Sequence, residues 1–324
     1  GGDYLYPPPV PEGYSFRVLE IPVSGLDDGD PGDARTGDRR YTVEFAGNNG
    51  YLLLAPPAEP IIGQVDIDTN AQIIALHGAD FSPQHDVPRS GPPGNSAVGR
   101  VLDVFTRGSN EPSIYFTKLR FNSAVNGNND SWNAGDPINF GGNGSNKSSW
   151  PSVYMEQIWW DDLWGWAGSS IGHTDLIKPN DGGTRDIYLA RSRGATSYQF
   201  FLINTDRFVT RYGPIPEGRN VFQDNQFVSI DPPSGWGGLG KSLFLSTNYT
   251  NNVTAGNYIP HLFVGGPGGG AEGYGNYVQD RSSIGHIGDL VNPPEGFGWG
   301  KDGANIIGRE DQPPSNRTGG LPLL

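Results

Sequence analysis

Clusters of Gly, Pro, Asn and Asp interrupt this chain every few residues, and they restrict its fold more than any other sequence feature. The 324 residues include 49 Gly and 28 Pro. Both residue types destabilise the interior of a helix, and no stretch keeps a helical spacing of apolar residues for more than a turn or two. The apolar runs between the clusters are short, and several alternate with polar residues. The sequence therefore predicts an all-β fold with much of its length in turns and loops.

Short segments rich in β-branched and aromatic residues are the predicted strands. They are 14–21, 41–45, 51–55, 63–68, 72–76, 99–106, 113–121, 152–159, 186–191, 197–204, 207–212, 226–230, 242–246 and 259–264. Two neighbouring pairs predict β-hairpins, 187–191 with 197–203 and 101–106 with 114–119. Because hairpins build antiparallel sheets, we expect one or two domains resembling a β-sandwich or jelly roll, with long loops rich in Gly, Pro and Asn.

The segment 126–149 is poor in apolar residues and dense in Gly, Asn and Ser, which predicts a linker or a long surface loop. We therefore expect an N-terminal β domain at 1–125 and a C-terminal β domain at 150–324. Both ends of the chain predict extended arms, since Pro7-Pro8-Pro9 favours polyproline II and 311–324 contains Pro-Pro and Gly-Gly. Such arms either lie on a neighbouring subunit or fray.

One pentapeptide occurs twice, because Ser169–His173 recurs as Ser282–His286. The match continues from Asp-Leu-Ile at 175–177 and Asp-Leu-Val at 289–291 into the residues that follow. We predict an internal duplication of about 155–191 and 270–309. Two copies are fewer than a solenoid generally needs, so two related modules or a pseudo-twofold within one domain are the favoured interpretations.

Charge and composition exclude several classes of function. The net charge is −13, which removes the basic surface that nucleic-acid binding requires and opposes binding to an anionic membrane. The chain has no Cys, so disulfides, thiolate metal sites and cysteine nucleophiles are excluded. An oxidising or exposed location fits this composition.

The densest aromatic cluster surrounds two carboxylates and consists of Trp159, Trp160, Asp161, Asp162, Trp164 and Trp166. Exposed Trp rings suit the apolar face of a sugar, and carboxylates suit its hydroxyls, so the cluster is a candidate carbohydrate site. Burial in the core or in a subunit interface is the alternative, and we favour it.

Each copy of the repeated loop carries a His near an Asp, His173 with Asp175 and His286 with Asp289. A His/Asp pair can bind a metal or act as a general base. The alternative is a His that is hydrogen-bonded to backbone in a packed loop, and this is the interpretation we favour.

Two acidic runs resemble calcium-binding loops. Asp28, Asp30 and Asp33 lie on a loop with Gly and Pro, and calcium is the one cofactor that we consider there. The run Asp66-Ile-Asp68-Thr-Asn70 opens like a calcium loop but lacks the Gly and Glu that should follow. Its alternation with Val65 indicates a strand instead.

These patterns favour a structural or adhesive surface protein of a virion (a phage capsid, tail or fibre component) or of a bacterial cell surface. Such a protein acts through self-assembly, as a homo-oligomer with other assembly subunits as partners. The alternative is an extracellular protein that binds or cleaves carbohydrate, with surface glycans as its partners. No catalytic residue is assigned, and neither nucleic acid nor membrane is expected as a partner.

Overall fold

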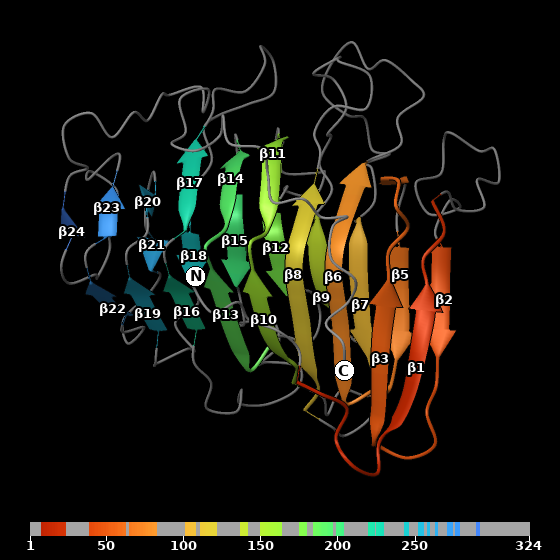
Figure 1. The fold of residues 1–324 in the computed structure, drawn as a ribbon. Coiled ribbons are helices and arrows are strands. Elements are labelled where there is room, and N and C mark those ends of the chain that lie inside the picture. Colours follow the sequence, from red (N-terminus) through yellow and green to blue (C-terminus); the bar gives the residue numbers. More distant parts are fainter. Residues whose placement is uncertain are drawn as a thin grey trace, which may run out of the picture.

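The computed structural model describes residues 8–23, 39–62, 65–82, 101–107, 111–121, 137–141, 150–163, 175–179, 184–196, 199–203, 220–223, 225–229, 243–245, 252–255, 258–259, 263–264, 271–274, 276–278 and 290–291. Its regular elements in these ranges are all strands, as the sequence predicts, and they form two sheets (Figure 1). No helix in the described ranges is long and apolar enough to cross a membrane.

The larger sheet, sheet A, has 16 strands. They are β1 (Ser15–Glu20), β3 (Gly50–Ala55), β4 (Ile61–Ile62), β6 (Ile73–Ser82), β8 (Ser113–Phe121), β10 (Ser152–Glu156), β11 (Trp159–Leu163), β13 (Asp186–Ala190), β14 (Arg193–Thr196), β16 (Asn220–Gln223), β17 (Gln226–Ser229), β19 (Asn252–Ala255), β20 (Tyr258–Ile259), β22 (Ala271–Tyr274), β23 (Asn276–Val278) and β24 (Leu290–Val291).

Sheet B has eight strands. They are β2 (Arg39–Val43), β5 (Val65–Thr69), β7 (Leu102–Thr106), β9 (Ile138–Gly141), β12 (Asp175–Pro179), β15 (Gln199–Ile203), β18 (Leu243–Leu245) and β21 (Phe263–Val264). Most predicted strands coincide with an observed one. The predicted strand 152–159 is divided between β10 and β11, and 207–212 lies outside the described residues.

Every strand pair in the described residues is parallel, which overturns the sandwich or jelly-roll expectation. Sandwiches and jelly rolls are built from antiparallel pairs. Both predicted hairpins are also wrong. β13 pairs with β10 and β16 in sheet A while β15 belongs to sheet B, and β7 and β8 are divided between the sheets in the same way.

The chain winds in successive turns of a solenoid-like arrangement. β10, β11 and β12 form one turn, and β13, β14 and β15 form the next, each strand pairing with its counterpart in the turn before. Figure 1 shows the turns following one another from red at one end to blue at the other. The expectation against a solenoid is therefore wrong. The repeating unit is one turn of the chain, and successive turns differ in amino-acid sequence.

One left-handed residue lies at the bend of each of four neighbouring turns in sheet A. Gly78, Lys118, Gln157 and Arg191 have φ values of 71°, 54°, 55° and 49°. The strand register places these four residues at equivalent positions in neighbouring turns. We call the strands before the bend the first half of sheet A and those after it the second half; β6 and β8 run through both.

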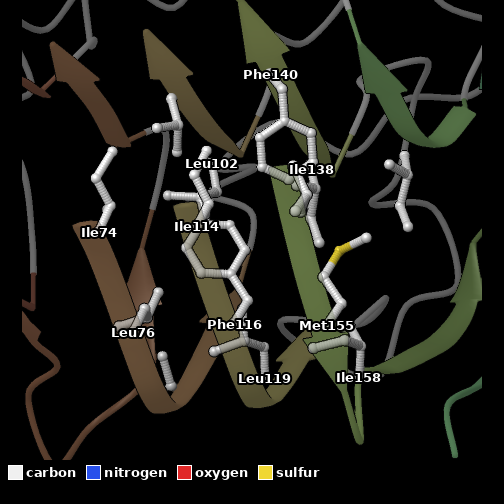
Figure 2. Packing of buried hydrophobic residues seen from close by; sticks show 14 of the residues in the cluster. Ile74, Leu76, Leu102, Ile114, Phe116, Leu119, Ile138, Phe140, Met155 and Ile158 are labelled. Carbon is white, nitrogen blue, oxygen red and sulfur yellow. The ribbon is translucent and has the colours of Figure 1, made fainter. Parts of the chain in front are cut away.

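The core lies between the sheets and is filled by alternate residues of each strand. In Figure 2, Leu102, Ile138 and Phe140 of sheet B point toward Phe116 and Met155 of sheet A. A stack of rings runs along the second half of sheet A, from Phe81 through Phe121 to Trp160, with neighbouring centroids 5.0 and 6.1 Å apart.

The ring stack reaches across one complete turn. Trp160 also contacts Phe227, 6.0 Å between centroids, although β14 lies between their strands. The residue of β14 at this position is Gly194, where a Cβ would lie 3.3 Å from Trp160 and from Leu176. Without a side chain there, the indole of Trp160 and the ring of Phe227 can approach each other.

The described residues do not test the predicted domain division and duplication. β9 falls inside 126–149 and pairs with β7 and β12, while most of that segment lies outside the described residues. Leu176 and Ile177 belong to sheet B, whereas their counterparts Leu290 and Val291 pair with β23 in sheet A. Both repeated pentapeptides, and the ends at 1–7 and 311–324, are outside the described residues, so the division and the duplication stay predictions.

Candidate functional site

Two residues of the predicted carbohydrate cluster are buried. Trp160 is 1% exposed and belongs to the ring stack of the core. Trp159 is 8% exposed on the outer face of β11, with the guanidinium of Arg193 5.4 Å from its ring centroid. Asp161 and Asp162 continue β11. Trp164 and Trp166 lie outside the described residues, and the carbohydrate site stays a prediction.

Of the other predicted site residues, the described part of the structure includes Asp175. Asp175 begins β12 and pairs with Gln199 of β15. The remaining candidates lie outside the described residues: His173, His286, Asp289, Asp28, Asp30 and Asp33. Within the described ranges, no group of three His, Cys, Asp or Glu side chains could by itself hold a metal ion.

A row of polar residues on the outer face of sheet B is the strongest candidate site. Asp66 of β5, Asp103 of β7 and Asn139 of β9 are register partners on three neighbouring strands. Their neighbours along each strand point into the core, so these three side chains lie on the opposite face. We call Asp66, Asp103 and Asn139 the acidic row; their exposed fractions are 6%, 1% and 0%.

The amide of Asn139 makes one of the hydrogen bonds in the acidic row. The Asn139 Nδ2 donates to Asp103 Oδ1 at 2.5 Å. The Asn139 Oδ1 is buried and has no hydrogen-bond partner among the described residues. Basic residues occupy the register positions at both ends of the row, Arg40 beside Asp66 and Lys178 beside Asn139.

An ion-pair network lies next to the acidic row. The carboxylate of Asp68, 1% exposed, accepts two hydrogen bonds from the guanidinium of Arg107, which also contacts Glu44 at 2.8 Å. The hydrogen bonds that Arg107 donates to Asp68 raise the pKa of Arg107 above its usual value. Arg40 is directed at Phe105, 5.2 Å from its centroid. The buried carboxylate of Asp68 is thus compensated by an arginine.

The outer face of sheet A carries a second polar row next to the bend. His77, Thr117 and Glu156 are register partners and all three are buried. The His77 Nδ1 lies 2.6 Å from the Thr117 hydroxyl, and burial, followed by the charge of Lys118, lowers the pKa of His77. The Glu156 carboxylate is paired with Arg191, whose Nε donates at 2.6 Å.

Three half-buried tyrosines, Tyr115, Tyr154 and Tyr188, occupy the adjacent register positions on this face. The rings of Tyr115 and Tyr154 are stacked, 5.0 Å apart and 15° from parallel. Burial, followed by the proximity of Tyr154, raises the pKa of Tyr115 above its usual value. We call these three residues the tyrosine row.

Sequence reasoning found part of the acidic row. It placed Asp66 and Asp68 on a strand, and β5 confirms this. It missed Asp103 and Asn139, which stand singly in the apolar segments Leu102–Thr106 and Ile138–Gly141. A lone polar residue at the centre of a short apolar run was the available signal.

No protein-family model, curated protein or solved structure matches this chain.

Proposed function

We propose that the chain is a structural or adhesive surface protein of a virion or a bacterial cell surface that acts through association with further copies of itself. The outer face of β1 carries this proposal. Phe16 and Val18 are 43% and 51% exposed, and they are the large hydrophobic side chains that the described part of the chain leaves exposed. Contiguous exposed apolar side chains on a soluble protein mark interaction surfaces.

The position of β1 supports an interaction between subunits. β1 is the terminal strand of the first half of sheet A in the described residues, where it pairs with β3 over its full length. The ring of Phe16 packs edge-on against Tyr51, with centroids 5.6 Å apart, so it is held in place before a partner binds. A fixed apolar side chain loses little conformational entropy on binding.

The inner face of β1 favours lateral over end-to-end association. The guanidinium of Arg17 lies 5.0 Å from the centroid of Phe45, so a charged group covers the end of the core. A charge at the end of a sheet opposes its extension by a further apolar strand. We therefore propose that two copies contact each other through the outer faces of β1, at Phe16 and Val18.

Sedimentation equilibrium over a range of concentrations tests this interface. We expect the wild-type chain to self-associate, and the double substitution Phe16→Lys with Val18→Lys to shift it to monomer, because buried lysines would oppose the contact. Glu20→Lys, on the same outer face, is the matched control for added positive charge and should retain the oligomer. A monomeric wild type, or an oligomer that survives the double substitution, contradicts the proposal.

Carbohydrate binding or cleavage is the second candidate function, and the tyrosine row favours it. The stacked rings of Tyr115 and Tyr154 cover each other's faces, so hydroxyls rather than ring faces would contact a sugar. Asp186 and Arg185, hydrogen-bonded to each other at 2.9 Å, lie beside the row and add groups that bind hydroxyls.

Binding to immobilised glycans, with reducing ends measured to detect cleavage, tests this candidate. If the tyrosine row binds sugar, Tyr154→Phe should weaken binding several-fold, because it removes one hydroxyl and keeps the stack. If the predicted tryptophan cluster binds instead, Trp164→Ala with Trp166→Ala should abolish binding and Tyr154→Phe should not change it. A wild type that binds no glycan rules out this function.

A further inference from the structure

A proline-rich segment of the chain, Pro8–Tyr14, packs on the outer face of sheet A. A cluster of buried side chains lies there on β3 and β6: Tyr51, Leu53, Ile73 and Ala75. Val10 and Tyr14 pack against this cluster. The segment turns before it enters β1, because the Tyr14 N–H donates to the Pro11 carbonyl at 3.1 Å and Gly13 has a φ of 81°. The chain thus covers part of its own sheet with a proline-rich segment.

A tyrosine hydroxyl binds the backbone of this segment. The Tyr51 hydroxyl donates to the Pro8 carbonyl at 2.9 Å. Proline has no N–H, and a polyproline II segment makes no internal hydrogen bonds, so such a segment presents carbonyl acceptors along its length. Burial, followed by the proximity of Tyr115, raises the pKa of Tyr51 to about 12, and the hydroxyl therefore stays a donor at neutral pH. Tyrosine hydroxyls on this face suit a proline-rich backbone.

The tyrosine row continues the face that the segment covers. Ala75, in the buried cluster, is the register partner of Tyr115, and the row extends from there to Tyr154 and Tyr188 on the next two strands. Tyr115 belongs to both surfaces, because it packs against the cluster and stacks on Tyr154. All three tyrosines are partly exposed. The group that binds Pro8 is therefore repeated on the adjoining part of the same face.

The spacing of the tyrosine row matches polyproline II. Tyr115 and Tyr188 are two strands apart. Two strand spacings measure about 9.6 Å. One turn of polyproline II contains three residues and rises about 9.3 Å. A proline-rich segment that runs along the row, across the strands, would therefore present equivalent carbonyls to every second tyrosine.

We propose that the tyrosine row binds a proline-rich segment of a partner protein in the polyproline II conformation. The Tyr154 hydroxyl donates to a carbonyl of this segment, as the Tyr51 hydroxyl does to Pro8. Tyr115 already hydrogen-bonds Ser113, so Tyr154 at the centre of the row is the assigned donor. Aromatic side chains suit such a partner, because a polyproline II segment is extended before it binds and loses little conformational entropy. The occupant is a separate polypeptide, since the chain's own segment lies over β3 and β6.

Fluorescence anisotropy of a labelled peptide Pro-Pro-Pro-Val-Pro, the sequence of residues 7–11, tests the site on the full chain. The wild type should bind this peptide, and Tyr154→Phe should weaken binding several-fold, because it removes one donor and keeps the ring stack. Tyr41→Phe removes a tyrosine hydroxyl from sheet B and should leave the affinity unchanged. A peptide with Ala in place of each Pro should bind more weakly, because it is not held extended before binding.

Two further variants separate the tyrosine row from its neighbours. If the peptide only displaces the chain's own segment, Tyr51→Phe should weaken binding and Tyr154→Phe should not, which overturns the proposal. Phe16→Lys with Val18→Lys should bind the peptide as the wild type does, so that loss of self-association and loss of peptide binding are observed separately. A wild type that does not bind the peptide, including one that binds glycans instead, also overturns the proposal.

Discussion

His77 links the protonation of one side chain to the stability of the fold. It is 7% exposed, and its lowered pKa means that the folded protein holds it neutral at pH values where the unfolded chain begins to bind a proton. The usual pKa of His is about 6.5. The stability that comes from burying neutral His77 is therefore present above about pH 6.5, and it is lost as the pH falls below this value.

The variant His77→Gln should reduce this acid sensitivity. Each proton taken up only on unfolding costs up to about 1.4 kcal/mol of stability per pH unit. The free energy of unfolding in urea, measured at pH 7.5 and pH 5.5, should fall more for the wild type than for His77→Gln. The other titratable groups are common to both proteins, so an equal fall in both would assign the acid sensitivity to other residues.

At the scale of structural elements, the bend connects the strands of the first half of sheet A to the strands of the second half. At two neighbouring bends, a buried amide is capped by a side chain of the following turn. The Ile158 N–H donates to Ser192 Oγ, and the Ser192 N–H donates to Asn225 Oδ1, both at 3.0 Å. Asn225 Nδ2 also donates to the Leu189 carbonyl at 2.9 Å. Each of these two bends is thereby held in place by the turn that follows it.

Asn225→Ala tests this coupling between turns. The substitution leaves a buried N–H at Ser192 and a buried carbonyl at Leu189 without partners, which should cost about 2–4 kcal/mol in the free energy of unfolding. Asn225→Ser should cost less, because Ser192 caps Ile158 from the equivalent position with its hydroxyl. Urea unfolding measures both. Equal stability of Asn225→Ala and the wild type would show that the cap contributes nothing.

At the scale of the whole molecule, the strand pattern was predictable and the pairing was not. Segments such as Ser113–Phe121 alternate between buried and half-buried residues, which is the period-2 pattern visible in the sequence. Parallel and antiparallel pairs both produce this alternation. The hairpins expected at 187–203 and 101–119 were wrong because closeness in sequence was taken as closeness in space.

The repeat of the turns does not appear in the sequence as a fixed period. Register partners are 19 residues apart for Asn252 and Ala271 but 40 residues apart for Ile73 and Ser113. Loops of such different lengths remove a fixed period from the sequence. The most visible repeat in the sequence is the pentapeptide Ser169–His173, which recurs 113 residues later as Ser282–His286, and because it has two copies it favoured two modules rather than a stack of turns.

The sequence by itself determined the secondary-structure class, because Gly and Pro exclude long helices and short alternating runs form strands wherever partners exist. It also indicated Asp66 and Asp68 as strand residues. Only the tertiary structure decided that the strands are parallel and that Asp66, Asp103 and Asn139 lie side by side. The physical reason is that a strand's hydrogen-bonding groups are its backbone, which is the same in every strand, so the choice of partner depends on the packing of the whole core.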